Sequence, residues 1–129
     1  MALKDFHKLG TVTIADGVAV SDAIEIPAGY CIAALDFADS WTAADCGFQI
    51  STDGGTTYVD VYSGVGTTTA RARVTGVIAT VSMVLVPSTV LRDLAIGCKV
   101  KLTSINAASN ADLNQTGIAT VRVWVAKVE

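Results

Sequence analysis

Apolar and polar residues alternate with a period of two along several short segments of this chain. In residues 118–128, for example, three valines share one face of the segment and Arg122 and Trp124 share the other. Such alternation is typical of β-strands that bury one face. The pattern predicts eight or nine strands, which lie within residues 11–14, 23–26, 30–37, 47–51, 58–61, 70–74, 81–86, 99–102 and 118–128.

Turn signals separate these segments at short, regular spacing. Asp-Gly at 16–17 and Asp-Gly-Gly at 53–55 are typical of β-hairpins, because glycine and aspartate adopt the required turn conformations. Pro87 ends the segment before it, and Ser88 can cap a short helix over residues 88–94. The chain therefore contains many strands and at most one short helix.

Many short strands with almost no helix predict an all-β fold. We expect a single antiparallel β-sandwich, jelly-roll-like, over residues 11–129. Residues 1–10 mix charged and apolar side chains without a clear period and end at Gly10, so we expect a short N-terminal arm there. A length of 129 residues is typical of one domain and too short for two.

Composition and charge narrow the possible partners. Apolar residues make up 51% of the chain and charged residues 16%, which excludes a disordered segment. A net charge of −3 argues against nucleic acid as the main partner. Residues 1–60 carry a formal charge of −7 and residues 61–129 carry +4, so the two halves can pair inside one fold or between copies.

Three cysteines leave an odd one and form no metal-binding spacing, so we expect neither a disulfide framework nor a zinc site. Cys31 and Cys98 begin apolar segments and are expected to be buried thiols in a reducing compartment. The N-terminus lacks the apolar stretch of a secretory signal, and no segment is apolar over the length of a membrane-spanning helix. We therefore expect synthesis in the cytoplasm and no membrane partner.

The sequence offers little for catalysis. His7 is the only histidine and lies in the expected arm, where a structural or solvated role is the simpler interpretation. Hydrolase, metalloprotease and phosphate-loop motifs are absent, so we expect no enzyme activity and no cofactor. Five aspartates could supply oxygen ligands to calcium, but their spacing favours turn roles and no metal site: Asp36, Asp39, Asp45, Asp53 and Asp60.

Residues 51–58 fit the pattern Ser-x-Asp-x-Gly-x-Thr followed by an aromatic residue. This segment resembles the Asp-box hairpin of sialidases and other β-proteins. The resemblance implies that the aspartate and hydroxyl groups hold the turn while the aromatic ring packs beneath it. It assigns a structural turn role, and no catalysis, to Ser51, Asp53, Gly55, Thr57 and Tyr58.

Three further motifs follow one another in the first half: Tyr-Cys-Ile-Ala-Ala-Leu at 30–35, Ser-Trp-Thr-Ala-Ala at 40–44 and Phe-Gln-Ile-Ser at 48–51, before the Asp-Gly-Gly-Thr-Thr hairpin. With Pro87 and the final valine-rich strand, this order resembles small all-β virion proteins of tailed bacteriophages and prophages, over about residues 22–128. The resemblance implies a capsid decoration (cement) protein on the virion surface. It further implies a homotrimer whose partner is the major capsid protein.

Two residues of the expected arm, Phe6 and Leu9, are candidates for a tether to the capsid. Other positions in the virion, such as the tail, the neck or a head-fibre base, stay open. The alternative function is a glycan-binding module, because sugar sites need an exposed aromatic platform. Trp41, in an expected loop, is the candidate platform for that function.

Overall fold

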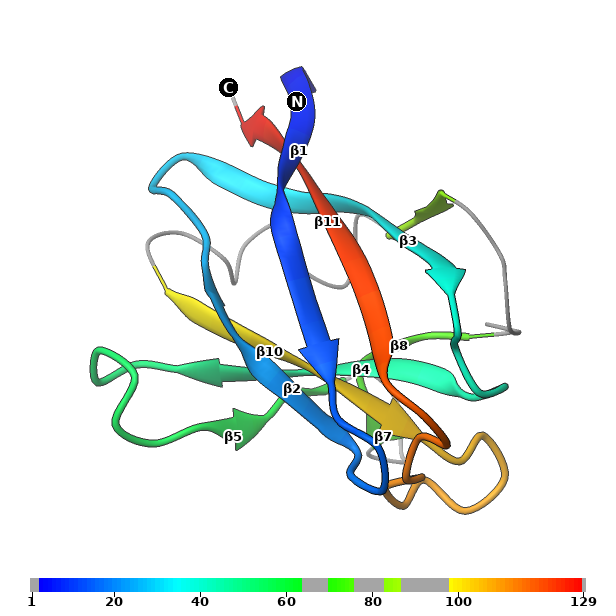
Figure 1. Ribbon diagram of the computed structural model, residues 1–129. Helices are drawn as coiled ribbons and strands as arrows, with labels where there is room; N and C mark the ends of the chain where they lie inside the picture. Colours follow the sequence, from blue (N-terminus) through cyan, green and yellow to red (C-terminus); the bar gives the residue numbers. More distant parts are fainter. Residues whose placement is uncertain (1–2, 64–69, 76–82, 87–97, 129) are drawn as a thin grey trace.

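The structure is a computed structural model that describes residues 3–63, 70–75, 83–86 and 98–128. These residues form strands, turns and loops and contain no helix, so the expected all-β fold is confirmed. Two antiparallel sheets pack face to face as a β-sandwich, which is also as expected (Figure 1). The short helix predicted at 88–94 lies outside the described residues.

Each sheet draws strands from both ends of the chain. Sheet I has the order β1 (Leu3–Ile14), β11 (Ala119–Val128), β3 (Tyr30–Asp39) and β9 (Val84–Leu85). Sheet II has the order β2 (Val20–Glu25), β10 (Lys99–Ile105), β4 (Asp45–Ser51) and β5 (Val59–Asp60), and β8 (Arg73–Val74) also pairs with β4. A small third sheet joins β6 (Tyr62–Ser63) to β7 (Ala70–Arg71).

The strand pairing is nested. The first strand pairs with the last, β2 with β10, β3 with β9, and β4 with both β5 and β8. The described strands thus form one long antiparallel ribbon that is rolled up, and the roll is closed where β11 meets β3 and β10 meets β4. A β-sandwich formed by rolling up such a ribbon has the topology of a jelly roll.

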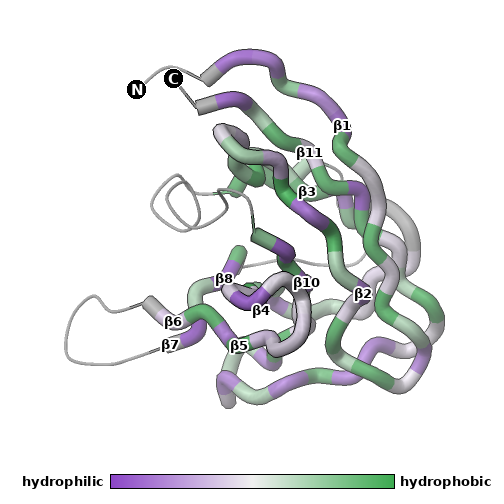
Figure 2. Tube along the Cα trace, turned by 90° about the vertical axis from the view of Figure 1, so that its left-hand side faces the viewer, coloured by the Kyte–Doolittle hydropathy of each residue, from purple (hydrophilic) through white to green (hydrophobic). Residues whose placement is uncertain are grey.

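The core lies between the sheets and follows the alternation seen in the sequence (Figure 2). Its fully buried side chains come from both ends and the middle of the chain, including Val12, Ile14, Leu35, Phe37, Phe48, Val100, Leu102, Val121, Val123 and Val125. Burial of each such side chain stabilises the fold by about 1.5–3 kcal/mol. Polar residues between them point away from the core on the two outer faces.

Residues 3–10, expected as an arm, form the first part of β1 and pair with β11. Two β-bulges interrupt this pairing. Lys4 lies opposite Lys127 and His7 opposite Val125, so β1 has one residue more than β11 between these pairs; a second shift follows Lys8. Each extra residue reverses the side-chain alternation. Residues 3–10 therefore have no regular period from which a strand could be recognised in the sequence.

Candidate functional site

A stacked aromatic pair lies on the outer face of sheet I. Trp124 sits between two valines of β11 that point into the core, so its own side chain points outward. Phe6 of β1 stacks on Trp124 with ring centroids 5.3 Å apart and planes 14° from parallel. Phe6 is 49% exposed, so one of its faces is available to a partner while the other covers Trp124.

The same face continues to the opposite edge of sheet I. Cross-strand pairing places Trp124 opposite Ala34 of β3, and Ala34 opposite Leu85 of β9. The side chain of Leu85 is 71% exposed, the largest value among the exposed large apolar residues of the described chain. Phe6, Trp124 and Leu85 together form what we call the outer patch of sheet I.

A polar cluster ties the start of β1 to β3. The hydroxyl of Tyr30 donates a hydrogen bond to Oδ2 of Asp5 at 2.6 Å, and Nδ1 of His7 donates to the backbone oxygen of Asp5 at 2.7 Å. The rings of His7 and Tyr30 meet edge to face. The bond to the Asp5 carboxylate raises the pKa of Tyr30, because the anionic form of Tyr30 could not donate it. These contacts give His7 a structural place beside the bulge.

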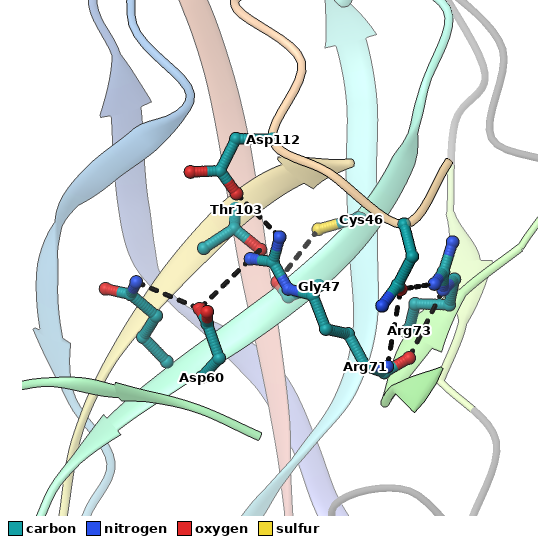
Figure 3. Close-up of polar contacts among 9 residues, drawn as sticks. Cys46, Gly47, Asp60, Arg71, Arg73, Thr103 and Asp112 are labelled. Carbon is teal, nitrogen blue, oxygen red and sulfur yellow. Dashed lines mark hydrogen bonds and ion pairs between the residues drawn. The ribbon is translucent and has the colours of Figure 1, made fainter. Parts of the chain in front are cut away.

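A second polar cluster covers the outer face of sheet II (Figure 3). Arg71 is 5% exposed, and its guanidinium donates to Asp112 at 2.6 Å, to Asp60 at 3.0 Å and to the hydroxyl of Thr103 at 3.1 Å. The partners come from strands β5 and β10 and from the loop after β10. Arg71 thus joins segments that are far apart in the sequence.

Arg73 extends this cluster along β4. Its guanidinium forms an ion pair with the buried Asp45 at 3.3 Å and donates to the side-chain oxygen of Asn110. Gly47 of β4 lies directly opposite Thr103 of β10. A Cβ at Gly47 would lie 2.2 Å from Cδ1 of Ile105 and 2.6 Å from Oγ1 of Thr103, so the close approach of these side chains requires glycine.

The charge difference between the two halves of the chain is partly neutralised within the fold. Asp60 and Asp45, from the acidic half, pair with the two arginines Arg71 and Arg73 from the basic half. A third pair joins Arg122 of β11 to a carboxylate of β3 at 3.8 Å. Removing one member of a buried ion pair leaves the other without its partner and is strongly destabilising. The arrangement of the sheet II cluster therefore points to a structural role.

The Asp-box-like hairpin brings its expected residues together. Oδ1 of Asp53 accepts bonds from the Ser51 hydroxyl at 2.8 Å and from the backbone N–H of Thr57 at 2.9 Å, and Oδ2 accepts the Thr57 hydroxyl at 2.5 Å. These bonds, led by the one from the Thr57 hydroxyl, hold the pKa of Asp53 far below its usual range. Gly55 has a φ of +101°, a conformation that favours glycine.

Tyr58 completes this turn. A Cβ at Gly55 would lie 3.3 Å from the hydroxyl of Tyr58, so the ring lies against the turn. The ammonium group of Lys101 sits over the ring, 4.2 Å from its centroid, as a cation–π contact. Both oxygens of the Asp53 carboxylate accept hydrogen bonds inside the hairpin, which gives the motif a structural function.

Trp41 does not form a platform for a ligand. Its side chain is 1% exposed, meets the ring of Phe37 edge to face at 4.8 Å, and donates from Nε1 to the backbone oxygen of Ala44. The expectation of an exposed aromatic ring at this position is therefore wrong. The loop after β3 turns inward and closes one end of the core with this ring.

The two expected tether residues have different surroundings. Leu9 packs against the core, while Phe6 lies in the outer patch of sheet I. Both belong to β1 and not to a separate arm. The structure does not bring them together as one surface, because Phe6 stacks on Trp124 on the outer face of sheet I while Leu9 faces the core.

The five aspartates considered as calcium ligands are dispersed. Asp45 and Asp60 face arginines of the sheet II cluster, Asp36 faces Arg122, and Asp53 lies in the hairpin. For the side chain of Asp39 no placement is described. Among the described residues, no group of three or more histidine, cysteine, aspartate or glutamate side chains could hold a metal ion.

All three cysteines are described, and none forms a disulfide bond. Cys31 and Cys46 are buried, and Cys98 is partly exposed. Burial raises the pKa of Cys46 and of Cys98, since the thiolate is disfavoured away from water. Within the described part of the chain, no helix is long and apolar enough to cross a membrane.

Sequence reasoning identified the hairpin but missed the aromatic pair and the sheet II cluster. Arg122 and Trp124 on the polar side of a valine-rich strand were a signal that large side chains cover the outer face of this sheet. The alternating arginines of residues 70–74, beside an acidic first half, were a signal of the ion pairs. Comparisons of this chain with protein family models, with curated proteins and with solved structures found no match.

Proposed function

We propose that this chain is a structural protein of a tailed bacteriophage particle, and more specifically a capsid decoration protein. It would bind the outside of the head and stabilise contacts between neighbouring capsomers, with the major capsid protein as partner and a homotrimer as the assembled form. The chain would be made in the cytoplasm of the host bacterium and act on the virion surface. No catalytic role is part of the proposal.

The outer patch of sheet I carries this proposal. Phe6 and Leu85 expose apolar surface on one face of the sandwich, 49% and 71% of their side chains, at opposite margins of the sheet. Exposed apolar groups on a single face favour a protein partner. The jelly roll itself supports the proposal only in part, because this architecture occurs in viral capsid proteins and also in lectins.

The proposal can be tested by cosedimentation with capsids. Heads of the phage or prophage that encodes this chain are isolated from a strain lacking the gene and mixed with the purified protein. We expect the wild type to sediment with the heads and the double variant Phe6→Ser, Leu85→Ser to lose at least about tenfold in affinity. Val59→Ser is the matched control, because Val59 is also exposed, at 57%, but lies on sheet II.

Absence of cosedimentation of the wild-type protein contradicts the capsid function. Equal losses for the sheet I variant and the Val59 control contradict the assignment of the outer patch. Binding of a glycan array by the wild type, lost in Phe6→Ser, instead favours the glycan-binding alternative, now with Phe6 in place of Trp41 as the exposed ring.

A further inference from the structure

The two parts of β1 are held in different ways. Residues 11–14 continue in regular register along β11, and Val12 and Ile14 are fully buried in the core. Residues 4–8 lie beyond the core, and all of them except the partly buried His7 are exposed. Leu9 packs on the core at the boundary between the two parts. Only the second part of β1 is therefore anchored by burial of apolar side chains.

The pairing of the first part is also irregular. Two bulges fall within this short stretch, and Asp5 has a φ of +59°, a left-handed conformation that non-glycine residues seldom adopt. Lys4 lies directly opposite Lys127, and like charges in such a position weaken a cross-strand pair. The stacking of Phe6 on Trp124 and the hydrogen bond from Tyr30 to Asp5 hold the segment in place. A segment attached in this way opens more readily than the core strands.

Opening of this segment would make part of β11 an edge strand. Residues 124–127 of β11 lie between β1 and β3, so release of residues 3–8 leaves the N–H and C=O groups on one side of this part of β11 without partners. Such an edge is a template for another strand. The segment with the best fit to that edge is residues 3–8 of a second copy, because it carries the same side chains in the same register.

We propose that residues 3–8 exchange between two copies of this chain, so that each segment pairs with β11 of the other copy. The pairing that opens inside one chain then forms again between the two chains with the same residues, and exchange of this type is a low-cost route to a dimer. Leu9 and Gly10, at the second bulge, form the hinge. The segment from Leu3 to Gly10 reaches up to roughly 26 Å when extended. The proposal does not depend on the capsid function.

Two variants, each with one introduced cysteine, test the exchange directly. One chain carries Lys4→Cys and the other Lys127→Cys, positions that lie opposite each other, and both carry Cys98→Ser because Cys98 is partly exposed. The two proteins, with tags of different size, are mixed at high concentration, treated with oxidised glutathione and separated on a non-reducing gel. We expect a disulfide-linked heterodimer, clearly above the yield from a mixture of Lys4→Cys with Lys101→Cys, which reports random collision.

Thr13→Cys mixed with Thr120→Cys is the matched control for the anchored part, because these residues also lie opposite each other. It should give no heterodimer above the collision level, and an equal yield from both pairs would mean that the whole chain opens, which contradicts exchange of residues 3–8 alone. Sedimentation of the protein without capsids adds a readout without introduced cysteines: the wild type should dimerise at high concentration, and a chain without residues 1–8 should lose this dimer. A monomeric wild type, or a heterodimer yield at the collision level, overturns the exchange whatever the result with capsids.

Discussion

Replacing Gly47 by alanine tests how closely the polar cluster of sheet II packs against its neighbours. The new Cβ would lie 2.2 Å from Cδ1 of Ile105 and 2.6 Å from Oγ1 of Thr103. Ile105 is fully buried, and Thr103 accepts a hydrogen bond from Arg71, so neither side chain can move without loss. Overpacking of this kind costs about 1–3 kcal/mol, and a weakened hydrogen bond adds about 1 kcal/mol.

The substitution also stabilises the folded chain by about 0.5–1 kcal/mol, because alanine loses less backbone entropy on folding than glycine. The expected net loss is about 2 kcal/mol, which corresponds to a decrease in Tm of about 7 °C for a domain of this size. Thermal unfolding followed by circular dichroism, with urea titration for the free energy, measures both values. Gly10→Ala is the control: Gly10 is also a strand glycine, but its Cβ would meet only Cδ1 of Ile24 at 3.4 Å, so its Tm should not fall.

A double-mutant cycle with Ile105→Val identifies the cause. Valine lacks the Cδ1 atom that the new methyl group would touch, so the loss in the double variant should be smaller than the sum of the single losses by about 1 kcal/mol. Additive losses, or a Tm for Gly47→Ala within about 1 °C of the wild type, would refute the close approach at Gly47.

Two further predictions concern charged residues. Arg71→Leu should lower the free energy of unfolding, measured by urea titration, by about 2 kcal/mol. Arg71→Lys should recover little of this loss, because an ammonium group cannot bridge Asp60 and Asp112 as the guanidinium does. Full recovery in Arg71→Lys would contradict this role of Arg71. The pKa of Asp53 is lower in the folded chain than in the unfolded chain, so its stabilisation is complete above about pH 4 and is lost as the pH falls further. Asp53→Asn should therefore lower the urea midpoint at about pH 7 and lower it by a smaller amount at about pH 2.5, and an equal decrease at both would contradict the assigned role.

The candidate site divides into parts that local sequence can and cannot reveal. The hairpin at residues 51–58 was predictable, because its hydrogen bonds to Asp53 and Ser51 join residues at most four apart. The side-chain hydrogen bonds of Arg71 join residues that are 11 to 41 positions apart in the sequence, so no local sequence pattern predicts them. The stacking of Phe6 on Trp124 joins the two ends of the chain and depends on the first-to-last strand pairing of the jelly roll.

Local sequence patterns are enough to establish the fold class and the side of each regular strand that faces the core. Alternation placed the valines of β11 and the apolar residues of β4 and β10 inside, since a period of two is a local property of extended backbone. Two further features follow only from the tertiary structure, because they do not depend on local alternation. Pairing with β11 turned residues 3–10 from an expected arm into a bulged strand, and packing drew Trp41 from an expected surface loop into the core. Both outcomes depend on partners distant in the chain, whose free energy of contact exceeds the local preference.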